Sequence, residues 1–270
     1  MTPAGLAAPG ILPPPGGAAA RLRGNVRVTL LGNVVYAAGL WLQLVLFARL
    51  GGPSALGSYA FALALAQPAM LLSQLQLRSL LASDARYAYS FREYRALRVA
   101  TSAAALVSMI PLAWASGQWR ILWPVLVPVC AQAAADGLAD IYCGLWQQHE
   151  RMAVAAWVLS LNAVASVALV AVAGWAGGGA PAMAAGSALG SCLALLFAHV
   201  RTRGDDQLGR HLASGAPLRG RRLVRLAREA APLGAIVLLG SLQTNVPRYA
   251  VQHYGGTASL GMFAAAYQLT

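Results

Sequence analysis

Long apolar segments recur along the whole chain and constrain its fold more than any other feature of the sequence. Seven of them reach about 20 residues or more, and another begins near residue 258. They lie at about 27–48, 55–81, 97–116, 121–145, 152–174, 181–200 and 231–252. A helix of about 20 apolar residues crosses the hydrocarbon core of a bilayer. The sequence therefore predicts an all-α, polytopic transmembrane helical bundle with about seven spans plus the start of an eighth.

Composition and charge exclude the main soluble classes of protein. Hydrophobic residues make up 58% of the chain and charged residues 10%, whereas soluble domains are about a quarter charged. A soluble enzyme, a disordered regulator and a secreted disulfide scaffold are therefore excluded. The net charge is +12, and all 20 basic residues are Arg. We attribute this excess to cytoplasmic loops and expect no nucleic-acid partner.

The distribution of the arginines predicts the orientation of the chain. Sixteen lie in the N-terminal segment and in the second, fourth and sixth connections between spans, and three lie in the opposite connections. Cytoplasmic loops of membrane proteins carry the excess of basic residues. We therefore expect the N-terminus and the Arg-rich connections to be cytoplasmic.

The chain divides into four segments. Residues 1–24 contain three consecutive prolines and are expected to form a flexible, non-helical cytoplasmic tail. Residues 25–200 form a first six-helix bundle, 201–230 a basic cytoplasmic linker, and 231–270 the start of a second, incomplete bundle. Within the linker, Leu218–Arg228 fits either an amphipathic helix on the membrane surface or a solvated loop. Because the last apolar segment stops after about a dozen residues, we expect an N-terminal half of a longer protein.

Two aspartates lie in the fourth predicted span, where ionisable groups are costly and therefore indicate function. Asp136 and Asp140 are four residues apart and so share one helix face. They are candidates for an ion-coupling site or for partners of an Arg across a cavity. For Asp140, pairing at the cytoplasmic interface is the preferred alternative; for Asp136 both interpretations stay open.

Three arginines at or near span ends are candidate ligands of a phosphate-bearing substrate: Arg49, Arg78 and Arg248. The alternative is that their side chains extend to the interface. Arg248 is the strongest candidate, because Pro247 bends the helix beside it and Asn245 can hydrogen-bond across helices. Asn245 is itself a further candidate for binding the substrate.

Glutamines in the first two spans are the remaining polar candidates. Gln43 and Gln74, with Gln67 and Gln76, either join helices by hydrogen bonds or line a path for a sugar. The sequence contains no His-Glu-x-x-His, Gly-x-Ser-x-Gly or P-loop motif, and its four histidines are scattered. We therefore expect neither an enzyme nor a bound metal or cofactor, and the three cysteines are expected to be buried apolar residues.

Three stretches resemble a known family of transporters. They are residues 76–84 with 89–98, residues 136–152, and residues 232–234 with 244–249, 254–256 and 260–265. Their order and spacing resemble those of oligosaccharide flippases of the polysaccharide transporter family, of the O-antigen translocase type. That family lies in the superfamily that includes the MATE exporters. The matching positions are Arg78, Asp84, Arg98, Asp140, Gln147, Asn245, Pro247 and Arg248.

The resemblance implies a MATE-like fold of two helix bundles around a cavity that opens alternately to each side. It implies transport of a polyprenyl-pyrophosphate-linked oligosaccharide to the outer leaflet of the bacterial inner membrane, for the synthesis of lipopolysaccharide or another cell-envelope polysaccharide. The expected partners are this lipid-linked oligosaccharide, membrane lipids and, as a further option, polysaccharide assembly enzymes.

Other functions remain as alternatives. A MATE-like cation or drug exporter would use Asp136 in its cavity, and a lipid II flippase would apply the same physics to another sugar. A membrane-embedded polysaccharide polymerase or acyltransferase is less favoured, because the predicted outward loops are short and nearly free of charge. A structural or interaction role is the alternative for a half-length chain.

Overall fold

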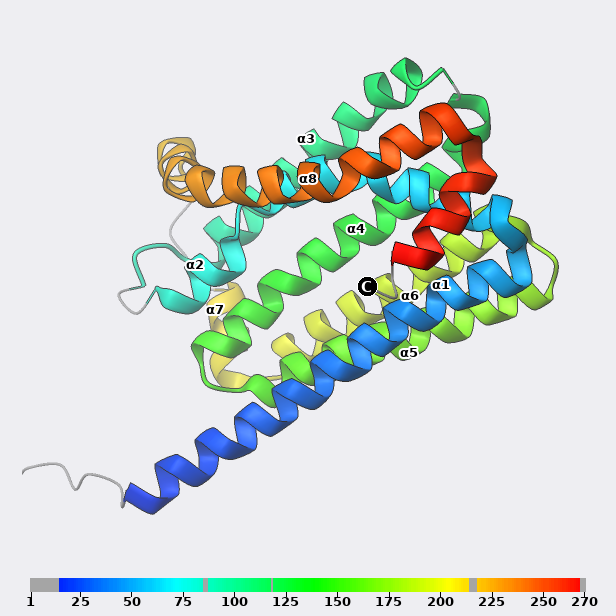
Figure 1. The fold of residues 1–270 in the computed structure, drawn as a ribbon. Helices are drawn as coiled ribbons and strands as arrows, with labels where there is room; N and C mark the ends of the chain where they lie inside the picture. The colour runs from blue at the N-terminus through cyan, green and yellow to red at the C-terminus, as the bar shows by residue number, and fades with distance from the viewer. Residues whose placement is uncertain (1–14, 85–86, 118, 214–217, 268–270) are drawn as a thin grey trace, which may run out of the picture.

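The computed structural model describes residues 15–84, 87–117, 119–213 and 218–267 and shows a bundle of helices (Figure 1). In these residues there are eight helices and no strand. They are α1 (Pro15–Gln74), α2 (Leu77–Ser83), α3 (Phe91–Ala115), α4 (Trp119–Gln148), α5 (Met152–Trp175), α6 (Gly179–Arg203), α7 (Asp206–Ala213) and α8 (Gly220–Tyr267). The predicted all-α fold is confirmed.

Two of the helices reverse direction at a glycine. In α1 the turn is at Gly52, with φ 77°, and in α8 it is at Gly256, with φ 74°. This left-handed region is open to glycine and strained for other residues. Helix α1 thus has a first arm, residues 15–51, and a second arm, residues 53–74, that runs back along the bundle (Figure 1). The sequence predicts the turn in α1 through the run Gly51-Gly52-Pro53.

Five segments of the described chain are long and apolar enough to cross a membrane, so the protein is a multi-pass membrane protein. They are Gly24–Ser83, Phe91–Ala115, Leu122–Gln148, Met152–Trp175 and Gly179–Arg203. The first contains both arms of α1. Helix α8, which carries Asn245 and Arg248 in its middle, is not among the five. The count of about seven spans and the orientation stay predictions.

The structure corrects the boundaries of the two polar segments. The non-helical tail predicted for residues 1–24 is wrong from Pro15 onward, because α1 begins there. Proline is tolerated in the first turn of a helix, and the alanines that follow favour helix; residues 1–14 lie outside the described part. The stretch Leu218–Arg228 is helical from Gly220 onward and continues without a break into α8, so it is not a separate surface helix.

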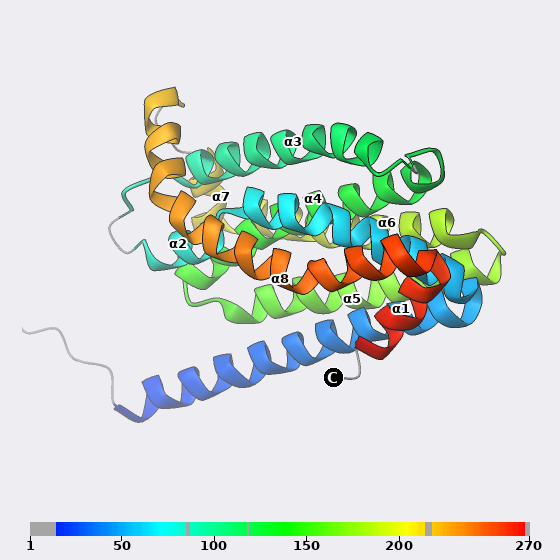
Figure 2. The same ribbon diagram turned by 45° about the horizontal axis from the view of Figure 1, so that its top comes forward.

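The second arm of α1 packs closely along α8 in both ribbon views (Figures 1 and 2). Two glycines permit this approach: a Cβ on Gly57 would overlap the carbonyl oxygen of Thr257, and one on Gly261 would overlap that of Pro53. Small residues let helix backbones approach in membranes, where apolar burial gives little driving force. The contact holds α8 against the first bundle and closes one side of the interior.

Candidate functional site

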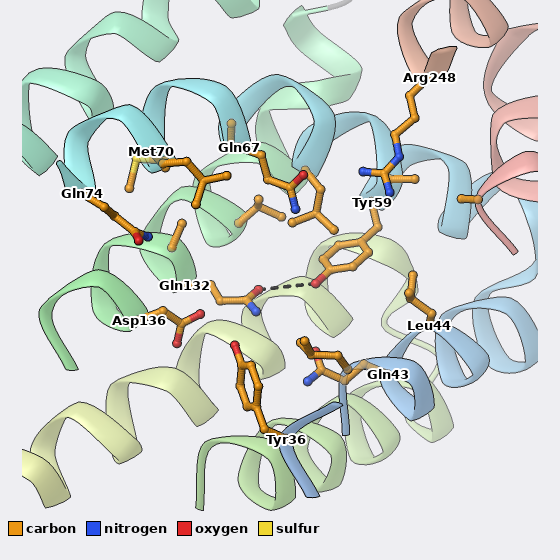
Figure 3. A pocket seen from close by; sticks show the side chains of 18 residues that line it. Tyr36, Gln43, Leu44, Tyr59, Gln67, Met70, Gln74, Gln132, Asp136 and Arg248 are labelled. Carbon is orange, nitrogen blue, oxygen red and sulfur yellow. Dashed lines mark hydrogen bonds between the residues drawn. The ribbon is translucent and has the colours of Figure 1, made fainter. Parts of the chain in front are cut away.

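Polar side chains from three helices surround a cavity of about 310 Å³ between the two arms of α1, α4 and the middle of α8, which we call the central cavity (Figure 3). Its polar lining consists of Tyr36, Gln43, Tyr59, Gln67, Gln74, Gln132, Asp136 and Arg248. Four amides, two phenols, one carboxyl and one guanidinium group thus converge inside a bundle whose core is mainly apolar. Polar groups at membrane depth are costly without partners, so this concentration marks a site for a polar ligand.

A further cavity of about 270 Å³ adjoins the central one, and we call it the Arg78 cavity. The two share Tyr36, Gln74 and Asp136 in their walls. The Arg78 cavity adds the polar groups Asn33, Arg78, Asp140 and Asn162. Together the cavities form a polar path from Arg248 on α8 to Arg78 on α2.

The guanidinium group of Arg248 points into the central cavity beside Tyr59 (Figure 3). Its Nη1 donates a hydrogen bond of 3.1 Å to Oδ1 of Asn245, and its Cζ lies 5.6 Å from the ring centre of Tyr267. Its buried Nε atom has no hydrogen-bond partner among the described residues. None of the ion pairs in that part of the chain, which holds all acidic residues, involves Arg248. Arg248 is therefore a cation whose charge no carboxylate neutralises.

Asn245 is buried between α8 and the second arm of α1 and positions the side chain of Arg248. Its side chain is 0% exposed, and its Nδ2 donates to the carbonyl oxygen of Ser241 at 2.8 Å and to Oε1 of Gln67 at 3.4 Å. The amide therefore links α8 to the second arm of α1 while its oxygen accepts from Arg248. The predicted hydrogen bond across helices is present.

Asp136 sits where the two cavities meet and is held by neutral donors. Nδ2 of Asn162 donates to Oδ1 of Asp136 at 2.6 Å, and the hydroxyl groups of Ser166 and Ser191 donate to Oδ1 of Asn162 at 3.2 and 3.4 Å. This network fixes the amide of Asn162 with its donor end toward the carboxyl group. A carboxyl group at this depth, with neutral partners, is suited to taking up a proton or a cation.

Asp140 joins two arginines at the other end of the path. Nη1 of Arg78 donates to Oδ1 of Asp140 at 2.9 Å, and Nη2 of Arg98 lies 3.5 Å from Oδ2. The Arg98 side chain is 0% exposed, and none of its three guanidinium nitrogens makes a hydrogen bond within the described residues. Two positive charges thus depend on one carboxylate.

Most of the predicted site residues line the path, and two do not. Asn245 is completely buried and lines neither cavity, so it supports Arg248 and does not face the path itself. Gln43, Gln74, Asp136 and Arg248 face the central cavity, and Arg78 and Asp140 face the Arg78 cavity. Arg49 is exposed near the turn at Gly52 and lines a separate hollow with Trp41 and Leu56. Its role as a ligand stays a prediction, without support from its position.

Several residues of the path are not predicted from the sequence. Tyr36, Tyr59 and Gln132 line the central cavity, and the hydroxyl group of Tyr59 donates to Oε1 of Gln132 at 3.5 Å (Figure 3). Asn162 was also missed. The signal that could have found them is the same as for Gln43, namely a polar or amphipathic side chain inside an apolar span.

The start of α8 contacts the loop before α3 at the Arg-rich end of the bundle. Nε of Arg222 lies 2.8 Å from Oε1 of Glu93, and its Nη2 donates to the carbonyl oxygen of Ala88 at 2.6 Å. The guanidinium group also lies 5.6 Å from the ring centre of Tyr89. Glu93 in turn caps the start of α3 together with Ser90. Arg222 therefore ties α8 to the first bundle at this end.

The described residues contain no group of three or more His, Cys, Asp or Glu side chains that could hold a metal ion. Within the described residues, the path instead offers hydrogen-bonding amides, the unpaired cation Arg248, and two carboxyl groups, of which Asp136 forms no ion pair and Asp140 pairs with arginines. It can bind a polar, anionic molecule and it can exchange a proton or a cation.

Comparisons with known proteins identify the fold and the family of the chain. A solved structure titled protein A matches 92% of this chain with a TM-score of 0.66 and 14% sequence identity, which shows a shared fold. This chain covers 60% of the length of that one. No curated protein matches the sequence. A model of the family described as polysaccharide biosynthesis protein matches residues 22–270, and the chain therefore belongs to that family.

Proposed function

We propose that this chain is part of a flippase that moves a polyprenyl-pyrophosphate-linked oligosaccharide to the outer leaflet for surface polysaccharide biosynthesis. It would act as a transporter and not as an enzyme, in the bacterial inner membrane, with its N-terminus and Arg-rich end in the cytoplasm. In this proposal the chain supplies about seven spans and the start of an eighth of a MATE-like fold of O-antigen translocase type.

The observation that carries the proposal is the polar path with an unpaired Arg248 inside an apolar helix bundle. A saccharide loses its hydration when it enters a membrane, and each unpartnered polar group then costs several kcal/mol, on the order of 2–7. The amides of Gln43, Gln67 and Gln132 can replace those lost hydrogen bonds. The guanidinium group of Arg248 presents forked donors to a phosphate.

Asp136 would couple transport to an ion gradient. It borders both cavities and its hydrogen-bond partner is the neutral Asn162. Uptake and release of a proton or cation there would change the charge at the midpoint of the path. Arg222 would act at the end of the path, because its contacts with Glu93 and Ala88 must separate if α8 moves away from α3.

A cation or drug exporter is a second candidate, and Asp136 favours it because a carboxyl group lines the cavity. The two functions differ in the residue that contacts the substrate. Arg248 would repel a cationic drug but would hold a pyrophosphate. Substitutions of Arg248 and of Asp136 therefore separate the candidates.

The test is complementation of a strain that lacks the gene, with the full-length gene carrying Arg248→Gln. We expect surface polysaccharide to fall at least tenfold and the lipid-linked oligosaccharide to stay on the cytoplasmic leaflet, shielded from a membrane-impermeant glycosidase in sealed spheroplasts. Arg210→Gln, the same change at an exposed position on α7, serves as the control and should restore normal amounts. Normal polysaccharide with Arg248→Gln, or drug sensitivity as the main defect, would contradict the proposal.

A further inference from the structure

A groove that shares no lining residue with the two cavities lies on the flank where α4 packs against both α3 and α6. We call it the flank groove, and its volume is about 340 Å³. Figure 2 shows these three helices together along one side of the bundle. The lining of the groove includes Arg95 and Val99 from α3, Tyr142 from α4, and Cys192, Leu196 and His199 from α6.

Most of the groove wall is apolar and faces the membrane. Val99 is 51% exposed and Leu196 is 56% exposed. Cys192 is exposed as well, so the prediction that all three cysteines are buried is wrong for this one, because it lies on the outer side of α6. In a membrane-spanning bundle, apolar side chains exposed on the flank contact lipid. An occupant of the flank groove therefore enters from the bilayer and contacts these side chains with a hydrocarbon chain.

One end of the groove carries cationic and hydrogen-bonding groups. Arg95 is half-buried, and it forms no ion pair with any of the eight acidic residues, all of which belong to the described chain. The Tyr142 hydroxyl lies 2.8 Å from Nδ1 of His199. When this hydroxyl donates, a neutral imidazole carries its proton on Nε2, which can then donate to another acceptor. Arg203 in the last turn of α6 adds positive charge at the same end.

We propose that the flank groove binds an anionic glycerophospholipid of the leaflet at the Arg-rich end of the bundle. Its phosphate would lie between Arg95 and His199, and one acyl chain would lie over Val99, Leu196 and Cys192. The charge complementarity decides the class of lipid, since Arg95 has no carboxylate and a zwitterionic headgroup brings its own cation. Basic pockets between membrane helices are known to hold anionic headgroups. The proposal does not depend on the substrate of the central cavity.

The test is lipid binding to the purified full-length protein in detergent, measured by native mass spectrometry with phosphatidylglycerol and phosphatidylcholine of equal chain length. We expect the wild type to favour phosphatidylglycerol at least tenfold, and Arg95→Gln to remove that preference. Arg201→Gln, an exposed residue near the same end of α6 that does not line the groove, should keep it. Equal binding of both lipids, or equal losses from the two variants, would overturn the proposal. Displacement of the lipid by equimolar inorganic phosphate would do so too, because it would indicate a site for a soluble anion.

Labelling of Cys192 gives a second measurement that needs no arginine substitution. Cys130 and Cys143 are buried, so a maleimide should react mainly with the exposed Cys192, and Cys192→Ser identifies that signal. A bound acyl chain covers Cys192. We expect phosphatidylglycerol to slow its labelling at least fivefold and phosphatidylcholine to leave the rate unchanged. Unchanged labelling with phosphatidylglycerol would contradict the proposed position of the chain.

Discussion

The two arginines at the ends of the polar path are in opposite electrostatic situations. Arg78 forms an ion pair of 2.9 Å with Asp140, and Asp140 also serves the buried Arg98. Arg248 instead donates to the amide oxygen of Asn245 and lies over the ring of Tyr267, and it forms no ion pair with a carboxylate of the described chain. The guanidinium groups of Arg78 and Arg98 pair with a carboxylate inside the protein, whereas that of Arg248 is available to a ligand.

The difference shows that the role of an arginine inside a membrane bundle depends on its partners and not on its depth in the membrane. At the Arg78 end, removal of one charge leaves another charge buried without compensation. At the Arg248 end, removal of the charge leaves only neutral groups behind. Substitutions at the first end should therefore affect folding, and substitutions at the second should affect transport.

The largest effect is expected from Asp140→Asn. The change removes the carboxylate that Arg98, at 0% exposure, depends on. Removing one partner of a buried ion pair costs about 3–5 kcal/mol. The melting temperature of the purified protein in detergent should fall by many degrees, and the yield of monodisperse protein should fall with it.

Two further variants test the cause of that loss. Asp206→Asn makes the same change on the exposed surface of α7 and should leave the melting temperature unchanged. Adding Arg98→Met to Asp140→Asn removes the uncompensated charge and should recover part of the stability. If Asp140→Asn has the melting temperature of the wild type, Arg98 does not depend on Asp140. The contrast drawn between the environments of Arg78 and Arg248 would then be wrong at the Arg78 end.

A smaller effect on stability, but a large one on binding, is expected from Asn245→Asp. The change gives Arg248 a carboxylate partner and so makes its environment resemble that of Arg78. Loss of the amide donor to Ser241 should cost about 1 kcal/mol. Binding of farnesyl pyrophosphate in detergent, measured by thermophoresis, should weaken at least tenfold because the new carboxylate competes for the guanidinium group.

Asn25→Asp is the matched control for this prediction. Asn25 lies on the first arm of α1 and donates to the carbonyl oxygen of Glu150, away from both cavities. The Asn25→Asp variant should bind farnesyl pyrophosphate with the affinity of the wild type. Equal affinities of Asn245→Asp and the wild type would mean that Arg248 does not bind the anion.

The sequence predicts the helices and several polar residues of the path better than it predicts which residues these contact. The apolar segments, the turn at Gly52 and the polar residues Gln43, Asp136 and Arg248 follow from residue type and spacing alone. Which side of each helix faces the interior does not, because apolar residues surround most of these helices. Tyr36 and Gln132 were missed for that reason.

Arg98 shows a second limit of prediction from sequence. It lies in the eighth position of α3, close to an Arg-rich connection, and this position predicts a solvated cytoplasmic residue. The structure buries it completely beside Asp140 on another helix. Only the packing of α3 against α4 brings these residues together, and a distance of 42 residues along the chain gives no local signal of it.

The smallest effect is expected at an ion pair outside the membrane, where Arg151 contacts the carboxylate of Asp205. The Arg151 side chain is 40% exposed and the Asp205 side chain 13% exposed, and an ion pair open to solvent on one side contributes on the order of 1 kcal/mol or less. Asp205 also accepts hydrogen bonds of 3.1 Å from the backbone N–H groups of Gln207 and Leu208 at the start of α7. Asp205→Asn should keep an acceptor for these N–H groups and lower the melting temperature slightly, whereas Asp205→Ala should cost about 1 kcal/mol more.

The dependence of this contribution on pH follows from the pKa of Asp205. Burial raises that pKa, but the N–H groups of Leu208 and Gln207 and the charge of Arg151 outweigh burial, so the folded-state pKa lies below its ordinary value. A carboxyl group whose pKa is lower in the folded than in the unfolded state stabilises the folded state. This contribution is complete at pH values above the unfolded-state pKa of about 3.9, and it disappears as the pH falls through the folded-state pKa. The small difference in melting temperature between wild type and Asp205→Asn should therefore be present at neutral pH and shrink in acid. A difference that grows in acid would mean that the carboxyl group of Asp205 is stabilised in its protonated form, which would contradict this prediction.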